Sequence, residues 1–252
     1  MIDLSTVVRF ALLLVRPGMV VMVAPALGGT YTPMHIKIAL TVLLAVTLAP
    51  SVTVPTAAND VSLTLLVARE VVIGLAIAIA VRALIAAAEL AGHLSGFQIG
   101  FSYAATVDPV SGVQNTVVTS LYGLLALLAF FAINGHHEIL RALAISYARL
   151  PIGAGSIDGS ILTSVRQILA LVFTVGARLA APIIVVLLIV ELAIGLISRS
   201  APALSFMVIG YPVRLLVGLA VVALMIATVP SVISSLVART IGLGLDLAAA
   251  FR

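Results

Sequence analysis

The stretch "GHLSGFQIG", from Gly92 to Gly100, places three glycines at intervals of four residues. On a helix this spacing puts them on one stripe, where two backbones can approach closely because no side chain lies between them. Three alanines at the same four-residue spacing precede these glycines: Ala83, Ala87 and Ala91. We therefore expect a long helix whose stripe of Gly92, Gly96 and Gly100 packs tightly against a neighbouring helix.

The composition around this helix is that of an integral membrane protein. Of the 252 residues, 63% are hydrophobic and 9% are charged, whereas soluble domains keep about 25% charged residues. The basic residues are scattered singly, so nucleic acid is not expected as a partner. The chain has no cysteine, which excludes disulfides and thiolate metal sites. The sequence predicts an all-α protein in contact with membrane lipid.

Apolar runs separated by turn residues predict about six helical segments, which we assign to one domain, residues 1–252, without a soluble lobe. The segments are 6–28, 34–50, 61–95, 113–133, 160–198 and 207–237. A long connection is expected between the fourth and the fifth, from "NGHHE" to "LPIGAGSIDGS".

The third and fifth segments are too long for a simple membrane crossing. About 20 residues cross the hydrocarbon core, whereas these segments run to about 35 residues, or about 50 Å. Three explanations stay open: Pro182 breaks the fifth helix, the helices extend beyond the membrane, or much of the protein does not lie across lipid.

The third segment also contains charges, which are costly at the centre of a bilayer. Arg82 and Glu89 lie seven residues apart and share a helix face, with His93 one turn further on. We expect this face to turn toward protein or water. The sequence leaves open whether the charges form internal ion pairs or line a transport path.

After Gly100 the sequence becomes small and polar, and Asp108 precedes Pro109 in the arrangement of a helix N-cap. The third and fourth segments are therefore expected to form a helical hairpin. Its tip carries Phe97, Gln98, Phe101, Ser102, Tyr103 and Asp108. This tip is either a plain turn or a functional loop, because irregular backbone at membrane depth is tolerated only in protein or beside a water-filled cavity.

Three ordered motifs carry a resemblance that spans essentially the whole chain: "QIGFSYAATVDPVSG", "FFAINGHHEILRALAISYARLPIG" and "ELAIGLISRSAPALSFMVIGYPVRLLVGL". Together they resemble the FliR family of flagellar biosynthesis proteins, which has relatives in virulence type III secretion systems. The resemblance implies a subunit of the flagellar export gate, in the bacterial inner membrane at the flagellar basal body. The partners it implies are FliP, FliQ and FlhB, and the substrates are unfolded exported proteins.

The resemblance further implies that the hairpin tip, residues 96–112, projects into the channel and helps to close it. Apolar and aromatic side chains can exclude water and ions from a constriction without recognising any one substrate. The residues expected in this pore or plug loop are Phe97, Gln98, Phe101, Tyr103, Asp108 and Pro109.

A second polar region follows the fifth segment. Glu191 and Arg199 lie about two helical turns apart, and Pro202 follows them. In the family this region resembles a tract used in subunit packing, although "SRSAPALSF" departs from the usual pattern. The residues expected at a subunit interface or in internal polar contacts are Arg82, Glu89, Glu191, Arg199 and Pro202.

The sequence gives no sign of catalysis. No nucleophile, base and orienting acid share a neighbourhood, so no enzyme and no cofactor are expected. His136 and His137 are adjacent and point apart on a helix, so no metal site is expected either. Two alternatives to the flagellar gate remain: a virulence secretion homologue, and an ion-coupled transporter with a relay of Glu70, Glu89, Asp108 and Glu191.

Overall fold

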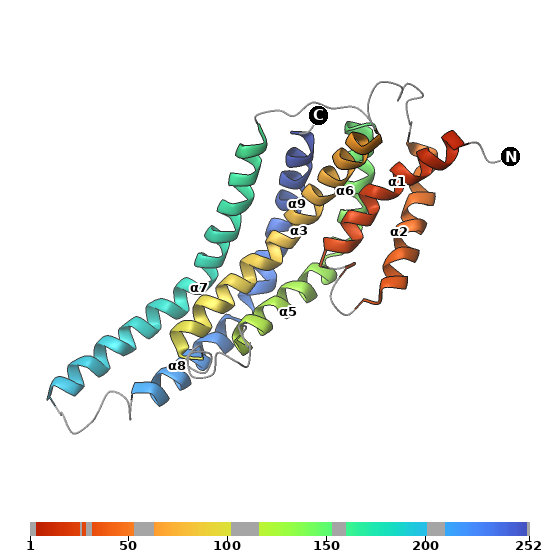
Figure 1. Cartoon of the computed structure of the whole chain (residues 1–252). Helices are drawn as coiled ribbons and strands as arrows, with labels where there is room; N and C mark the ends of the chain where they lie inside the picture. The colour runs from red at the N-terminus through yellow and green to blue at the C-terminus, as the bar shows by residue number, and fades with distance from the viewer. Residues whose placement is uncertain are drawn as a thin grey trace. The chain divides into compact units, whose positions relative to one another are not determined.

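The computed structural model describes residues 4–25, 27–28, 32–52, 63–101, 116–152, 160–200 and 210–250, and these residues form helices and turns without a strand. The prediction of an all-α protein is confirmed. The helices are α1 (Leu4–Val23), α2 (Met34–Leu48), the short 3-10 helix η1 (Ala49–Ser51), α3 (Leu63–Ile99), α5 (Val117–Ala132), α6 (Gly135–Arg149), α7 (Ser160–Ser200), α8 (Tyr211–Met225) and α9 (Thr228–Ala249) (Figure 1).

The two overlong helices are present as predicted. Helix α3 has 37 residues and α7 has 41, whereas about 20 residues cross a bilayer core. The explanation that Pro182 breaks the fifth segment is wrong, because α7 continues through it. Leu179 and Ile183 on either side of the proline are buried, and this packing stabilises a helix that lacks one backbone hydrogen bond.

The expected long connection after residue 133 is wrong in its first half, where the chain forms α6. Asn134 adopts a left-handed conformation with a φ of 58°, so α5 ends and a new helix begins at Gly135. Helix α6 buries one face, formed by Ile139, Ala142, Leu143 and Ser146. This i, i+3, i+4, i+7 pattern is the signature of an amphipathic helix, which the polar residues of "NGHHE" obscure.

The last predicted segment, 207–237, is also two helices rather than one. The helical pattern breaks after Met225, and α9 continues to Ala249. At the break, the Thr228 hydroxyl donates a hydrogen bond of 2.7 Å to the carbonyl of Met225. Pro230 lies in the first turn of α9. A proline is tolerated there because the backbone N–H groups of the first turn form no hydrogen bond within the helix.

Three described helices are long and apolar enough to cross a membrane: α3, α7 and α9. A fourth span is possible if the bent pair of α5 and α6 counts as one. Helices α2 and α8 are apolar but shorter. This supports the predicted membrane protein, by length and composition.

The chain divides into two compact units. Unit 1 comprises Met1–Leu84, Phe130–Ala170 and Leu236–Arg252, and unit 2 comprises Ile85–Ala129 and Leu171–Ser235. The assignment of a single domain, residues 1–252, remains a prediction.

In unit 1, α1 lies beside α2 (Figure 1) and also against α3. A Cβ on Gly74 of α3 would lie 2.9 Å from the Cβ of Met19 and 2.9 Å from the Arg16 carbonyl oxygen, so only a glycine permits this approach. Helix α9 approaches α3 in the same way, through Gly244 and Ala80. The first half of α3 is therefore the central helix of unit 1.

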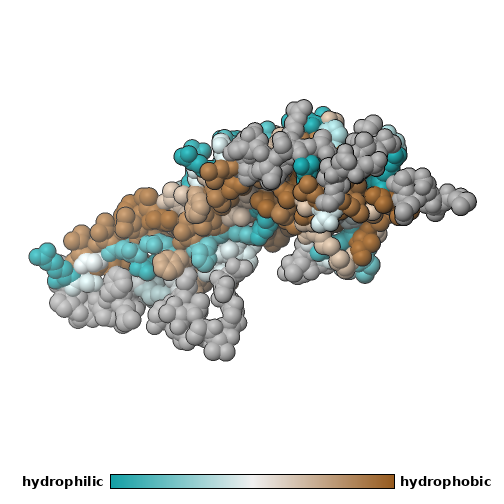
Figure 2. All heavy atoms as spheres, turned by 45° about the horizontal axis from the view of Figure 1, so that its top comes forward, coloured by the Kyte–Doolittle hydropathy of each residue, from teal (hydrophilic) through white to brown (hydrophobic). Residues whose placement is uncertain are grey.

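In unit 2, the second half of α3 is the central helix. Gly176 of α7 lies against Leu90, and Gly218 of α8 lies against Ile99. The part of α7 in this unit presents mostly apolar residues on the face shown in Figure 2. Unit 2 positions the end of α3, where the sequence predicts the functional loop.

Candidate functional site at the end of helix α3

Two of the three stripe glycines contact the start of α5. A Cβ on Gly92 would lie 2.7 Å from the Cα of Thr119 and 2.8 Å from the Val118 carbonyl oxygen. A Cβ on Gly96 would collide with the side chain of Thr116. Since the contacts on α5 run backward as those on α3 run forward, the two helices form an antiparallel hairpin.

The third glycine, Gly100, ends α3. Its φ is +106°, a conformation that favours glycine. The Gly100 N–H donates to the Phe97 carbonyl at 3.1 Å, and the Phe101 N–H donates to the Gly96 carbonyl at 3.0 Å. These two bonds form the Schellman motif, which satisfies carbonyls left open at a helix end. A Cβ on Gly100 would also lie 2.9 Å from the ring of Tyr211 in α8.

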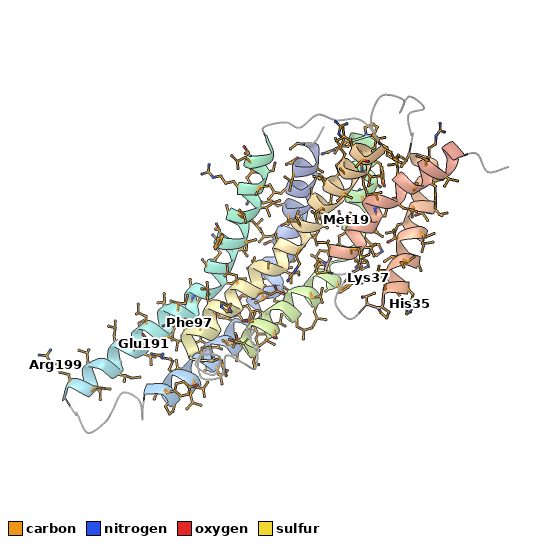
Figure 3. All side chains as sticks on the ribbon, viewed as in Figure 1. Met19, His35, Lys37, Phe97, Glu191 and Arg199 are labelled. Carbon is orange, nitrogen blue, oxygen red and sulfur yellow. The ribbon has the colours of Figure 1, made fainter. Side chains whose placement is uncertain are left out.

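The described part of the predicted plug loop is Phe97, Gln98 and Phe101. Phe97 is 66% exposed and lies in the last turn of α3 (Figure 3). Gln98 and Phe101 are half-buried. Tyr103, Asp108 and Pro109 lie outside the described residues. The end of α3 therefore exposes an aromatic side chain. Exposure of such a side chain to water is unfavourable.

Glu191 of α7 joins the end of α3 to the start of α8. Its Oε1 atom lies 2.6 Å from Nη2 of Arg214 and accepts a hydrogen bond of 3.1 Å from Nε2 of Gln98. Both charged groups are partly exposed. The sequence predicts polar contacts of Glu191 but not its partners. Arg214 could have been suspected, because a charge inside an apolar helix must find a partner.

Of the other predicted polar residues, the structure describes Glu89, Arg82 and Arg199. Glu89 is half-buried in unit 2 beside Gly123 of α5, whose Cβ would lie 3.2 Å from the Glu89 Cγ. Arg82 is half-buried in unit 1. Arg199 is exposed in the last turn of α7, away from Glu191 (Figure 3). Pro202 lies outside the described residues.

Unit 1 contains a polar cluster that the sequence did not reveal. Arg16 and Glu70 form an ion pair through Arg16 Nε and Glu70 Oε2, and a second bond joins Arg16 Nη2 to Glu70 Oε1 at 3.1 Å. Nη2 also donates to the carbonyl of Leu150 at 2.7 Å. The guanidinium lies over the ring of Tyr147, 4.5 Å from its centroid, and such a contact is attractive.

The histidines of "NGHHE" form a ring contact rather than a ligand set. The His136 ring lies 5.5 Å from that of Phe131 and 4.2 Å from that of His137. Within the described part of the chain, no three acidic, histidine or cysteine side chains gather as a metal would require.

Comparison with known proteins gives the family. A family described as bacterial export proteins, family 1, matches residues 7–240. The flagellar biosynthetic protein FliR of Escherichia coli (strain K12) is 34% identical over 215 residues, which cover 83% of this chain and 81% of that protein. FliR of Pectobacterium carotovorum subsp. carotovorum is 33% identical, with 82% and 80% covered. FliR of Caulobacter vibrioides is 31% identical, with 88% and 90% covered. Since the match extends over most of both chains in each case, this protein belongs to the FliR family of bacterial export proteins.

Proposed function

We propose that this protein is a subunit of the flagellar type III protein export gate, in the bacterial inner membrane at the flagellar basal body. It assembles with FliP, FliQ and FlhB-type proteins into the channel through which unfolded flagellar proteins are exported. Residues 96–112 help to close the pore of that channel. Its work is assembly and gating rather than catalysis.

The observation that carries this proposal is the exposed Phe97 on a helix end that is otherwise tightly fixed. The Schellman motif and the contact of Gly100 with Tyr211 hold the backbone on which Phe97 stands. An apolar side chain held in this way can narrow a pore and exclude water from it. The exposed aromatic side chain and the family together support a gating role.

The alternatives receive less support. The three relatives compared above carry flagellar names, which favours the flagellar system over a virulence system. In an ion-coupled transporter, the relay residues Glu70 and Glu191 would each have to take up and release a proton. In the structure each is paired with an arginine, Arg16 and Arg214 respectively, which supports a structural use of both acids.

Assembly is tested by purifying the tagged protein, expressed alone and together with its FliP and FliQ neighbours, and analysing the extracted complex by native mass spectrometry. We expect a single copy of this chain inside a FliP and FliQ assembly. A stable monomer or homodimer that ignores these partners would contradict the proposal.

Gating is tested by replacing Phe97 with alanine and measuring ion leak through the assembled complex without substrate. Phe173 of α7 provides a matched control, because it belongs to the same unit and is 64% exposed. We expect leak to rise with Phe97→Ala, and also with Phe101→Ala, but not with Phe173→Ala. Equal leak in all three variants and the wild type would contradict the gating role.

A further inference from the structure

The carboxylate of Glu191 connects three helices through one oxygen atom. Its Oε1 atom lies 2.6 Å from Nη2 of Arg214, which belongs to α8. The same atom accepts a hydrogen bond of 3.1 Å from Nε2 of Gln98, which belongs to α3. A carboxylate oxygen has two lone pairs, so it can hold both donors at once. A change at Glu191 therefore acts on two other helices together.

Both partners stand at helix ends. Gln98 is two residues before Gly100, where α3 ends. Arg214 lies in the first turn of α8, three residues after Tyr211, whose ring lies against Gly100. Glu191 thus ties the end of α3 to the start of α8 at the point where Phe101 leaves the helix.

These helices also pack through contacts that do not involve Glu191. Gly176 of α7 lies against Leu90 of α3, and Gly218 of α8 lies against Ile99 of α3. The three polar side chains are partly exposed and are not part of the buried core. Loss of the carboxylate should therefore leave the helices in place and remove the polar contacts that join the last turn of α3 to α7 and α8.

We propose that Glu191 is a positioning residue of the export gate. By holding Gln98 and Arg214, it fixes the last turn of α3 and so the direction in which Phe97 and Phe101 point. This inference rests on the proposed function, because the positioned residues are those assigned to the gate.

The experiment compares Glu191→Leu with a charge exchange, Glu191→Arg combined with Arg214→Glu. The exchange restores an ion pair of reversed polarity, and the Gln98 amide can turn to accept instead of donate. Glu138→Gln is the matched control, since it removes an exposed ion pair with Arg141 in unit 1. Each variant is expressed with the FliP and FliQ partners, and the amount of assembled complex is measured.

Two properties are then measured on the assembled complex. The first is ion leak without substrate. The second is measured separately, in variants that also carry Phe101→Cys. It is the rate at which a maleimide labels this chain, whose sole thiol is the introduced one because the chain has no cysteine of its own. The labelling rate reports the position of the end of α3 independently of any gate.

We expect Glu191→Leu to raise both the leak and the labelling rate several-fold, the charge exchange to return both toward the wild type, and Glu138→Gln to change neither. Wild-type labelling in Glu191→Leu would overturn the inference. So would a charge exchange that labels as fast as Glu191→Leu. If Glu191→Leu does not accumulate, Glu191→Gln replaces it, because the amide keeps the volume and loses the charge.

Failure of the proposed function gives a different result. In that case the labelling rate responds to Glu191→Leu and to the charge exchange, but neither these variants nor Phe97→Ala alters ion leak. The positioning of α3 by Glu191 would then be supported, and its assignment to an export gate would be overturned.

Discussion

Arg16 of α1 and Glu70 of α3 form an ion pair in the core of unit 1, where their side chains are 0% and 1% exposed. The same guanidinium donates to the carbonyl of Leu150, the C-cap residue of α6. A cationic group at a helix C-terminus is favourable, since the carbonyls there carry partial negative charge. One side chain thus joins three helices that lie far apart in the sequence.

Breaking this pair from one side should destabilise the protein strongly. We expect Arg16→Met or Glu70→Leu alone to lower the free energy of unfolding by about 3 to 5 kcal/mol, because each leaves an uncompensated buried charge. The double variant should recover part of the loss, but not all of it, because the Leu150 carbonyl still lacks its donor. Thermal melting of the detergent-extracted protein measures the effect.

The exposed pair of Glu138 and Arg141 serves as the control, and Glu138→Gln should melt close to the wild type. A double variant that is less stable than both single variants would contradict the expected recovery, because it would show that the two side chains stabilise unit 1 independently of each other.

Close packing of α3 against α5 predicts a second effect. Gly92→Ala should destabilise the protein by about 1 to 3 kcal/mol, because the new methyl group meets the backbone of Thr119, which cannot rotate away. Gly195→Ala in α7 is the control, since no atom beyond the neighbouring residues and nearby backbone of its own helix lies within 4 Å of its Cβ position. We expect it to stabilise the helix by about 0.5 to 1 kcal/mol. Equal melting temperatures for the two variants would refute the close approach.

The end of α3 predicts a third effect. Gly100→Ala should cost about 1 to 3 kcal/mol from the positive φ alone, with a further cost from collision with the Tyr211 ring. Adding Tyr211→Leu should therefore recover the part of the lost stability that comes from the collision with the ring. The part that comes from the positive φ of residue 100 should remain. Complete restoration would mean that the conformation of Gly100 carries no strain, and no restoration would mean that the ring moves freely.

The sequence by itself determined the class of the protein and its longest helices. Composition excludes a soluble protein, and the apolar runs of segments three and five give α3 and α7 because hydrogen bonding within a helix is local. The glycine spacing indicates a close helix contact, since Gly92, Gly96 and Gly100 share one stripe for geometric reasons alone. The motifs, being linear, were sufficient to indicate the family.

The tertiary structure decided which residues meet. The sequence shows that Arg16, Glu70, Glu191 and Arg214 lie in apolar surroundings and need partners, but any acid could satisfy any arginine. Helix α6 also depends on tertiary contacts, because the polar residues at its start predict a loop. In the structure Asn134 adopts a left-handed conformation before the helix, and Leu143 is buried in the core. Pro182 is tolerated within α7 for the same reason. Local patterns set which groups must be buried or paired, and only the folded chain sets the partner, since the partners are up to 134 residues apart.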